Sequence, residues 1–304
     1  MKLGYIGLGK MGFNMVERLL EKGYEVVVFG RNEKVVRDIK ERGAEPASSI
    51  QVLVSALPLP RIIWLMIPYQ AVEGVLKELV PYLDEGDTII DGGNSFFKDS
   101  MKRARELEEK GVHFLDVGVS GGPGGARNGA CIMVGGRKEI YRKFKSLFRD
   151  LSVRGGYDYM GKSGAGHFVK MVHNGIEYGM MQAIAEGFAI MKASPFDLDL
   201  MNVAEIYNHR SVIESRLVGW LKNAFDEYGQ DLEDVSSSVA HTGEGAWTVE
   251  VAKELGVPAR TIEEALLFRI ESQKNPSYTG RILSALRNQF GGHEVFEKKE
   301  ERHI

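Results

Sequence analysis

The sequence has a single cysteine, Cys131, in 304 residues. One thiol can form neither an intramolecular disulfide nor a thiolate metal cage, which suits a reducing compartment. The chain also lacks any apolar run close to the roughly 20 residues that a membrane-spanning helix needs. Its amino terminus leads directly into an apolar segment and a glycine turn, without the features of a secretion signal. We therefore expect a cytoplasmic protein that is not inserted in a membrane.

Neither charge sign dominates, because 39 Lys and Arg residues face 42 Asp and Glu residues, for a formal net charge of −3. This balance gives no general reason to expect nucleic-acid binding, although a local basic pocket for a small anion is compatible with it. His167, His209 and His241 lack the spacing of metal ligands and are interpreted as structural or surface residues. No metal is expected.

The first half of the chain alternates strand-like apolar runs with helix-like patterns. The runs cover residues 2–6, 25–29, 62–67, 88–91, 113–117 and 130–134. This alternation predicts an α/β domain of the Rossmann type, a parallel doubly wound sheet over residues 1–162. From about Gly161 helical periodicity takes over, at residues 167–191, 211–225 and 261–271, and predicts an all-helical domain over residues 163–304.

A glycine turn follows the first predicted strand and precedes a helical pattern over residues 11–21. Its residues, Gly7-Leu8-Gly9-Lys10-Met11-Gly12, read G-x-G-x-x-G. Glycines at these positions allow a tight turn and a close backbone approach, and the helix start offers N–H groups to a pyrophosphate. In this context the motif predicts a nicotinamide dinucleotide site.

The end of the second predicted strand, Phe29-Gly30-Arg31-Asn32, bears on the choice of dinucleotide. An acid there accepts the ribose 2′-OH of NAD, whereas an arginine pairs with the 2′-phosphate of NADP. Since the strand end has no acid and offers Arg31, we predict a preference for NADP. The nearby Glu33 and a merely solvated Arg31 leave NAD open.

Lys170, His173, Asn174, Glu177 and Tyr178 stand at offsets of 0, 3, 4, 7 and 8 in a helical pattern, so they share one stripe. An amine and a carboxyl on one face can divide acid and base chemistry when burial tunes their pKa values. A polar stripe is often only a solvated surface, and that interpretation stays open.

Several segments together resemble the signature blocks of 6-phosphogluconate dehydrogenases. They are Asp91-Gly-Gly-Asn-Ser95, residues 118–122 and 125–127, residues 164–177, Gly243-Glu-Gly-Ala-Trp-Thr248, Phe268-Arg269 and Arg287-Asn-Gln-Phe-Gly-Gly-His293. The resemblance spans nearly the whole chain and favours the short members of that family, which lack a duplicated helical region.

This resemblance implies oxidative decarboxylation of 6-phosphogluconate to ribulose 5-phosphate and carbon dioxide, with reduction of NADP or NAD. It implies that Lys170 takes the proton from the C3 hydroxyl and later polarises the C3 carbonyl. Glu177 would then protonate C1 of the enediol. The family's reaction needs no metal.

The resemblance also implies binding roles. Substrate contacts are expected at Asn94, Ser120, Gly121, Gly122, His173, Asn174 and Thr248, with Tyr178, Arg269, Arg287 and His293 around the sugar phosphate. Cofactor contacts are expected at Gly7, Leu8, Gly9, Lys10, Met11, Gly12, Arg31, Asn32, Met66 and Asn94. In the family the carboxy-terminal tail reaches a neighbouring active site, which implies a homo-oligomer, dimer or tetramer, with the helical domain serving substrate binding and assembly.

Three positions depart from the family's pattern. Ala246 stands where longer members have a Lys, so one substrate contact is missing or replaced. Gly30 replaces an Asn that often precedes the cofactor-selecting arginine. Asn32 stands where NADP-specific members often have Thr, although its amide can donate to a phosphate.

Two alternatives remain at this point. A non-decarboxylating 3-hydroxyacid dehydrogenase, such as 3-hydroxyisobutyrate dehydrogenase, would share the glycine turn and a helix with Lys170 and Asn174 four apart. A non-catalytic NADP-binding sensor would share the fold alone. His173, Glu177 and the segment with Arg287 and His293 favour the phosphorylated substrate over the first alternative. The presence of both Lys170 and Glu177 argues against the second.

Overall fold

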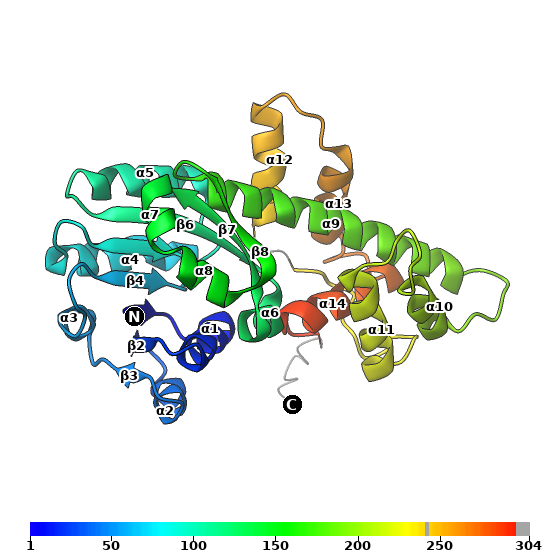
Figure 1. The fold of residues 1–304 in the computed structure, drawn as a ribbon. Helices are drawn as coiled ribbons and strands as arrows, with labels where there is room; N and C mark the ends of the chain where they lie inside the picture. The colour runs from blue at the N-terminus through cyan, green and yellow to red at the C-terminus, as the bar shows by residue number, and fades with distance from the viewer. Residues whose placement is uncertain (241–242, 296–304) are drawn as a thin grey trace, which may run out of the picture. The chain divides into compact units, whose positions relative to one another are not determined.

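The computed structural model describes residues 1–240 and 243–295 (Figure 1). These residues form two compact units, which divide between Met171 and Val172. In the described part of the chain, the first unit holds a sheet with the strand order β3-β2-β1-β4-β5-β6-β7-β8. The strands are β1 Lys2–Ile6, β2 Glu25–Phe29, β3 Glu45–Pro46, β4 Ile62–Leu65, β5 Thr88–Asp91, β6 His113–Ser120, β7 Ala130–Gly136 and β8 Ser152–Gly161.

Most neighbouring strands run parallel, as predicted, but β6 and β7 pair antiparallel, with Ser120 opposite Cys131. The expectation of a fully parallel sheet is therefore wrong at this pair. The two strands are joined only by a short helix, α6 (Gly122–Asn128), and an antiparallel return needs no long crossover.

Helices α1 Lys10–Glu21, α2 Glu33–Glu41, α3 Ile50–Ser55, α4 Tyr69–Leu79, α5 Phe97–Glu108, α7 Lys138–Lys143 and α8 Lys145–Leu151 complete the first unit, with a 3₁₀ turn at Val80–Tyr82. Alternation along β4 sends Ile62 and Trp64 to one face of the sheet and Ile63 and Leu65 to the other. Both faces are thus covered by helices, as in a doubly wound fold.

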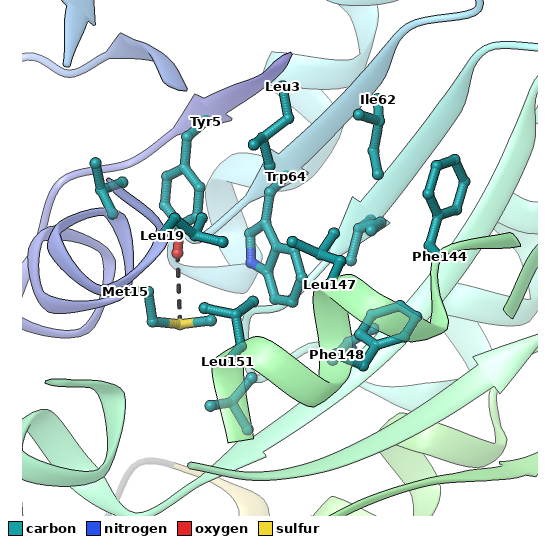
Figure 2. Packing of buried hydrophobic residues seen from close by; sticks show 14 of the residues in the cluster. Leu3, Tyr5, Met15, Leu19, Ile62, Trp64, Phe144, Leu147, Phe148 and Leu151 are labelled. Carbon is teal, nitrogen blue, oxygen red and sulfur yellow. Dashed lines mark hydrogen bonds between the residues drawn. The ribbon is translucent and has the colours of Figure 1, made fainter. Parts of the chain in front are cut away.

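The core on the α1 and α8 side is built around Trp64, whose ring is stacked on Tyr5 with the two ring planes 4° apart (Figure 2). Phe148 and Leu151 of α8 and Met15 and Leu19 of α1 fill the same layer. These side chains are fully or almost fully buried, so this core fixes the strand end that leads into the glycine turn.

The second unit is helical throughout its described residues. Helix α9 (Ala165–Lys192) crosses from the first unit into the second, and α10 Leu200–Tyr207, α11 Arg216–Tyr228, α12 Glu244–Glu254, α13 Arg260–Glu271 and α14 Tyr278–Gly291 follow. Its core joins Met181 and Phe188 of α9 to Phe225 of α11 and Leu283 of α14. The expected all-helical second domain is confirmed, and across the described residues no helix is long and apolar enough to cross a membrane.

Candidate active site

The glycine turn has the strained, tight geometry that the motif predicts. Gly7 has φ +105°, and a Cβ on it would lie 2.3 Å from the carbonyl oxygen of Met66. A Cβ on Gly12 would lie 2.0 Å from the carbonyl oxygen of Gly7. Both positions therefore require glycine. Helix α1 begins at Lys10 with no acidic residue in its first turn, so its N–H groups fit an anionic pyrophosphate.

The other expected cofactor residues of the first unit lie around this turn. The backbone N–H of Met66 donates to the carbonyl of Ile6 at 2.8 Å, which places Met66 beside the turn. Arg31 is exposed just after β2, and Asn32 caps α2 by accepting the N–H groups of Lys34 and Val35 through its side-chain oxygen. The amide nitrogen of Asn32 is a separate donor, so capping is compatible with a phosphate contact.

The departure at Gly30 has a packing role. A Cβ on Gly30 would lie 3.0 Å from the side chain of Leu8, the second residue of the glycine turn. A larger residue at position 30 would therefore press on Leu8.

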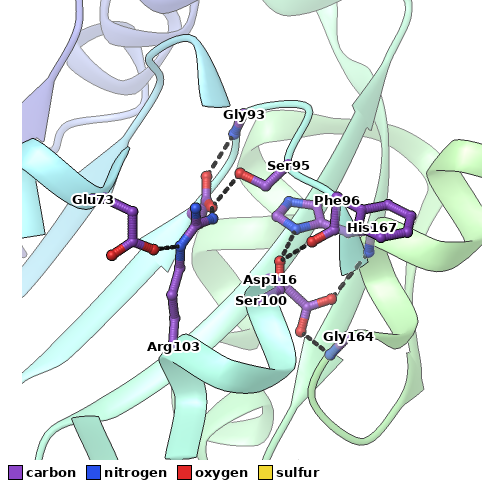
Figure 3. A network of polar contacts seen from close by, with 10 residues as sticks. Glu73, Gly93, Ser95, Phe96, Ser100, Arg103, Asp116, Gly164 and His167 are labelled. Atoms are coloured by element: carbon purple, nitrogen blue, oxygen red, sulfur yellow. Dashed lines mark hydrogen bonds and ion pairs between the residues drawn. The ribbon is translucent and has the colours of Figure 1, made fainter. Parts of the chain in front are cut away.

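The loop that carries Asn94 is held by a buried carboxyl (Figure 3). Asp91, at the end of β5, accepts the N–H of Gly93 at 3.1 Å and the hydroxyl of Ser95 at 2.7 Å. Arg103 of α5 pairs with Asp91 at 3.4 Å and with Glu73 at 2.8 Å. Asn94 itself is exposed between these anchors, so its side chain is presented by a fixed loop.

The expected Ser120-Gly121-Gly122 contacts form a glycine turn at the end of β6. Gly121 and Gly122 have φ +131° and +64°, values that L side chains rarely adopt. A Cβ on Gly121 would lie 3.0 Å from the backbone of Gly125. The turn therefore exposes backbone rather than side chains, which suits contact with a carboxylate.

Helix α9 begins against the same strand. Lys170 is 8% exposed, and its Cβ lies against Gly118 of β6. His167, one turn earlier, is buried, and its Nδ1 lies 2.7 Å from the hydroxyl of Ser100 on α5. His209 is exposed, and His241 lies outside the described residues.

In the second unit, α9 continues the polar stripe. Nδ1 of His173 lies 3.0 Å from Oδ1 of Asn174 and 3.9 Å from Oε2 of Glu177. The side chains of His173 and Glu177 are 38% and 24% exposed. These two side chains are thus partly exposed, whereas Lys170 and Tyr178 on the same stripe are buried.

The expected phosphate contacts Tyr178, Arg269 and Arg287 form a buried cationic cluster. The Arg269 guanidinium carbon lies 3.4 Å from the centre of the Tyr178 ring. Burial is the main reason that the pKa of Arg269 falls to about 10, while Tyr178 and Glu177 favour its charged form and Arg287 opposes it. Burial also lowers the pKa of Arg287, against Tyr178, Glu177 and Glu244. Two buried cations lie near each other in this unit, an arrangement that an anion would stabilise.

Arg269 also has a hydrogen-bond donor without a partner among the described residues. This donor is its buried Nε, and one terminal nitrogen lies 3.6 Å from the sulfur of Met181. Buried N–H groups without partners are costly and rare, so a bound anion is a natural acceptor for them.

The remaining substrate positions lie in the same unit. Thr248 of α12 is buried and donates to the carbonyl of Glu244 at 2.8 Å, while its methyl packs on Gly175 of α9. Ala246 packs beside the small apolar cluster of Tyr178, Val249, Ala265 and Leu266, so it supplies no charge in place of the missing lysine. His293 follows α14 and accepts a hydrogen bond from Asn288 through its carbonyl.

Sequence reasoning missed three residues of the first unit that hold its expected site residues in place, namely Ser100, Arg103 and Asp116. Each is buried and polar. Asp116 gave a signal, because a charged residue inside the apolar run of β6 needs a partner when it is buried.

A Rossmann-type sheet with this glycine turn, followed by an all-helical unit, has the architecture of a nicotinamide dinucleotide-dependent oxidoreductase. The profile of the NAD-binding domain of 6-phosphogluconate dehydrogenase matches residues 2–161, and that of the C-terminal domain of 6-phosphogluconate dehydrogenase matches residues 166–304. The chain belongs to the 6-phosphogluconate dehydrogenase family, which confirms the expected resemblance.

Individual relatives agree. YqeC of Bacillus subtilis (strain 168), provisionally named a 6-phosphogluconate dehydrogenase, is 45% identical over 98% of this chain and 100% of the relative. The NAD(+)-dependent, decarboxylating 6-phosphogluconate dehydrogenase of Haloferax volcanii is 44% identical over 98% of this chain and 99% of the relative. The structure of Plasmodium falciparum 6-phosphogluconate dehydrogenase, described with NADP+ and with 6-phosphogluconate, is 30% identical, with a TM-score of 0.83 over 99% of this chain and 67% of that chain.

A 3-hydroxyisobutyrate dehydrogenase from Salmonella typhimurium also matches, with 18% identity and a TM-score of 0.74 over 93% of this chain and 99% of that chain. At this identity the match shows a shared fold only.

Proposed function

We propose that the protein oxidises and decarboxylates 6-phosphogluconate to ribulose 5-phosphate and carbon dioxide while reducing NADP, or NAD. The observation that carries this proposal is the buried pair Arg269 and Arg287, with an unmet donor at Nε of Arg269. A sugar phosphate supplies the anion that these groups fit, because guanidinium groups bind phosphate oxygens through charge-assisted bonds. A simple 3-hydroxyacid has no phosphate and leaves the cluster unused.

Lys170 acts as the general base. Its amine takes the proton of the C3 hydroxyl, and the nicotinamide, when bound, supplies the hydride acceptor. Lys170, now protonated, donates a hydrogen bond to the C3 carbonyl oxygen and neutralises the charge that develops there as the carboxylate leaves. Glu177, seven residues later on α9, protonates C1 of the resulting enediol.

Asn94, His173 and Asn174 orient the substrate hydroxyls, and the turn of Ser120, Gly121 and Gly122 orients its carboxylate. Gly7 and Gly12 would shape the cradle for the pyrophosphate, and Met66 and Asn94 would contact the cofactor. Arg31 binds the 2′-phosphate of NADP. The NAD-dependent relative from Haloferax volcanii makes the preference a matter for direct measurement.

The proposal is tested by following reduction of NADP and of NAD with 6-phosphogluconate while measuring carbon dioxide release. Equal amounts of reduced nucleotide and gas support it. Reduction without gas, or equal turnover of 3-hydroxyisobutyrate, would indicate the simple hydroxyacid dehydrogenase. Cofactor binding without turnover of any hydroxyacid would indicate a sensor.

The assembly proposal is a homo-oligomer, dimer or tetramer, in the cytoplasm. Its dinucleotide-binding domain spans residues 1–162, its helical substrate and oligomerisation domain residues 163–304, and its tail completes a neighbouring site. Arg287 lies in α14 near Glu177 and Tyr178 of its own chain, so the exchanged part of the tail begins after this helix. A mixture of K170A chains and chains truncated before His293 tests this. Restored activity in the mixed oligomer supports exchange, and inactivity contradicts it.

A further inference from the structure

Strand β6 carries Asp116, Gly118 and Ser120 at alternate positions, so all three lie on one face of the sheet. Asp116 and Gly118 contact the first turns of α9. Ser120 enters the turn expected to orient the substrate. One face of β6 thus contacts the first turns of α9, the helix that bears Lys170, and also leads into the turn at Ser120.

Asp116 caps α9 from outside the helix (Figure 3). Its Oδ1 accepts the N–H of Gly164 at 2.7 Å, and its Oδ2 accepts the N–H of His167 at 3.0 Å. The first N–H groups of a helix have no partner within it, and the positive end of the helix dipole favours a carboxylate there. Because Asp116 is fully buried, water cannot replace it.

Two glycines bring the helix backbone unusually close to the strand. A Cβ on Gly166 would lie 2.2 Å from the carbonyl oxygen of Asp116, and a Cβ on Gly118 would lie 2.4 Å from Cβ of Lys170. Real side chains do not approach so closely, so any larger residue on either side forces α9 away from β6. This contact fixes both the rotation of the helix and the position of Lys170.

We infer that Asp116 and Gly118 are positioning residues for Lys170: the Asp116 cap and the Gly118 contact hold the first turns of α9 where the Lys170 amine meets the C3 hydroxyl. The inference rests on the proposed role of Lys170 as the base. Neither residue acts on the substrate. A displacement of about 1 Å in a catalytic group costs roughly a hundredfold in rate, so small shifts of α9 matter.

The test compares G118A and D116N with matched controls in the same unit. G74A adds the same methyl group at an exposed helical position with nothing within 4 Å, and D38N makes the same change at an exposed position of α2. We expect G118A to lower kcat by roughly a hundredfold and D116N by about tenfold, with NADP affinity unchanged. Both controls should keep wild-type kcat.

Two readouts separate positioning from general damage. With substrate deuterated at C3, the isotope effect on kcat should rise in both variants, because hydride transfer becomes rate-limiting. Lys170 should also react faster with trinitrobenzenesulfonate, followed by peptide mass spectrometry, since it leaves its buried position. Because D116N adds no heavy atoms to the packed contact, it decides between positioning and general damage if G118A fails to fold.

Wild-type kcat in D116N, or a loss of kcat with unchanged isotope effect and unchanged Lys170 labelling, would overturn the inference. Labelling does not depend on the substrate. If the wild-type enzyme does not oxidise 6-phosphogluconate, the proposed function fails, while labelling of Lys170 in D116N still decides whether Asp116 positions it.

Discussion

The guanidinium carbon of Arg269 lies 3.4 Å from the centre of the Tyr178 ring, and Arg269 is 2% exposed. The ring holds the planar group by a cation–π contact, so its donors keep a fixed direction. A lysine in its place would keep the positive charge but would lack the planar guanidinium group and its paired N–H donors. The Arg269–Tyr178 contact therefore adds a fixed geometry to the charge of the proposed phosphate site.

We predict that R269K raises KM for 6-phosphogluconate by roughly tenfold to a hundredfold, since one or two charge-assisted bonds are lost, with a smaller effect on kcat. R260K, on the exposed start of the same helix, is the control and should behave as wild type. Steady-state kinetics with saturating cofactor measures both. An unchanged KM in R269K would remove Arg269 from the phosphate site.

The low pKa of Arg269 predicts a pH dependence. Its pKa, about 10, lies below its ordinary value mainly because of burial, so keeping Arg269 charged in the folded protein costs stability at any pH below about 10. This cost is present at neutral pH and is relieved as pH rises through about 10. A bound anion offsets the same cost. Inorganic phosphate should therefore raise Tm near neutral pH, and this effect should fade above a pH of about 10.

R269M provides the comparison for this effect. Without the guanidinium, phosphate should raise Tm much less at neutral pH, and the change near pH 10 should disappear. Thermal melting with and without phosphate, over a series of pH values, measures both points. An equal phosphate effect in R269M and wild type would show that the anion binds elsewhere.

Much of the first unit was predictable because buried strands produce a strong signal. The predicted runs at residues 2–6, 25–29 and 88–91 match β1, β2 and β5. Strand β8 was not predicted, since only its first residue is buried and its glycines break any alternation. Strand β3 is two residues long. The direction of β7 was missed because the apolar pattern of a strand carries no information on its partner's direction.

The candidate site also contains residues that the sequence identified and residues that it did not. Residues with proposed chemical functions, such as Lys170 and Glu177, stood out through their spacing on one helix. The residues that hold them were harder to assign. Asp116 is a charge inside an apolar run, but its partners lie 48 and 51 positions later in the chain, at Gly164 and His167. His167 is a second example. The sequence could not decide whether it is a structural or a surface residue, and its burial beside Ser100 depends on tertiary packing.

Glu177 gives a prediction about the last chemical step. E177Q cannot deliver a proton to C1, so kcat should fall by roughly 10² to 10⁴ with little change in KM. C3 deuteration should then have no effect on kcat, because a step after hydride transfer limits the rate. E250Q, an exposed position of α12, is the control. A slowed E177Q enzyme with a larger C3 isotope effect would place Glu177 in the first step instead.

Arg31 gives a prediction about cofactor choice. R31A should lower kcat/KM with NADP by roughly tenfold to a hundredfold, the value of a charge-assisted bond to the 2′-phosphate, and leave the value with NAD unchanged. R37A is the control, because Arg37 is an exposed arginine of α2 with only a 3.8 Å pairing to Glu33. Equal losses with both nucleotides would show that Arg31 does not select the cofactor.

Arg103 gives a prediction about stability. It is 3% exposed and pairs with Asp91, which is fully buried and holds the Asn94 loop. R103M leaves the Asp91 carboxyl without its buried cation, and removing one partner of such a pair costs about 3 to 5 kcal/mol. R105M changes an exposed arginine of the same helix and should cost at most about 0.5 kcal/mol.

Urea unfolding of both arginine variants measures the difference in the free energy of unfolding. The Asn94 loop should also loosen in R103M, because Asp91 is the acceptor for both Gly93 and Ser95. Hydrogen exchange at the Gly93 amide should therefore rise in R103M beyond what the lower global stability explains, while R105M leaves it unchanged. Equal free energies of unfolding in the two variants would show that the Asp91 carboxyl does not depend on Arg103.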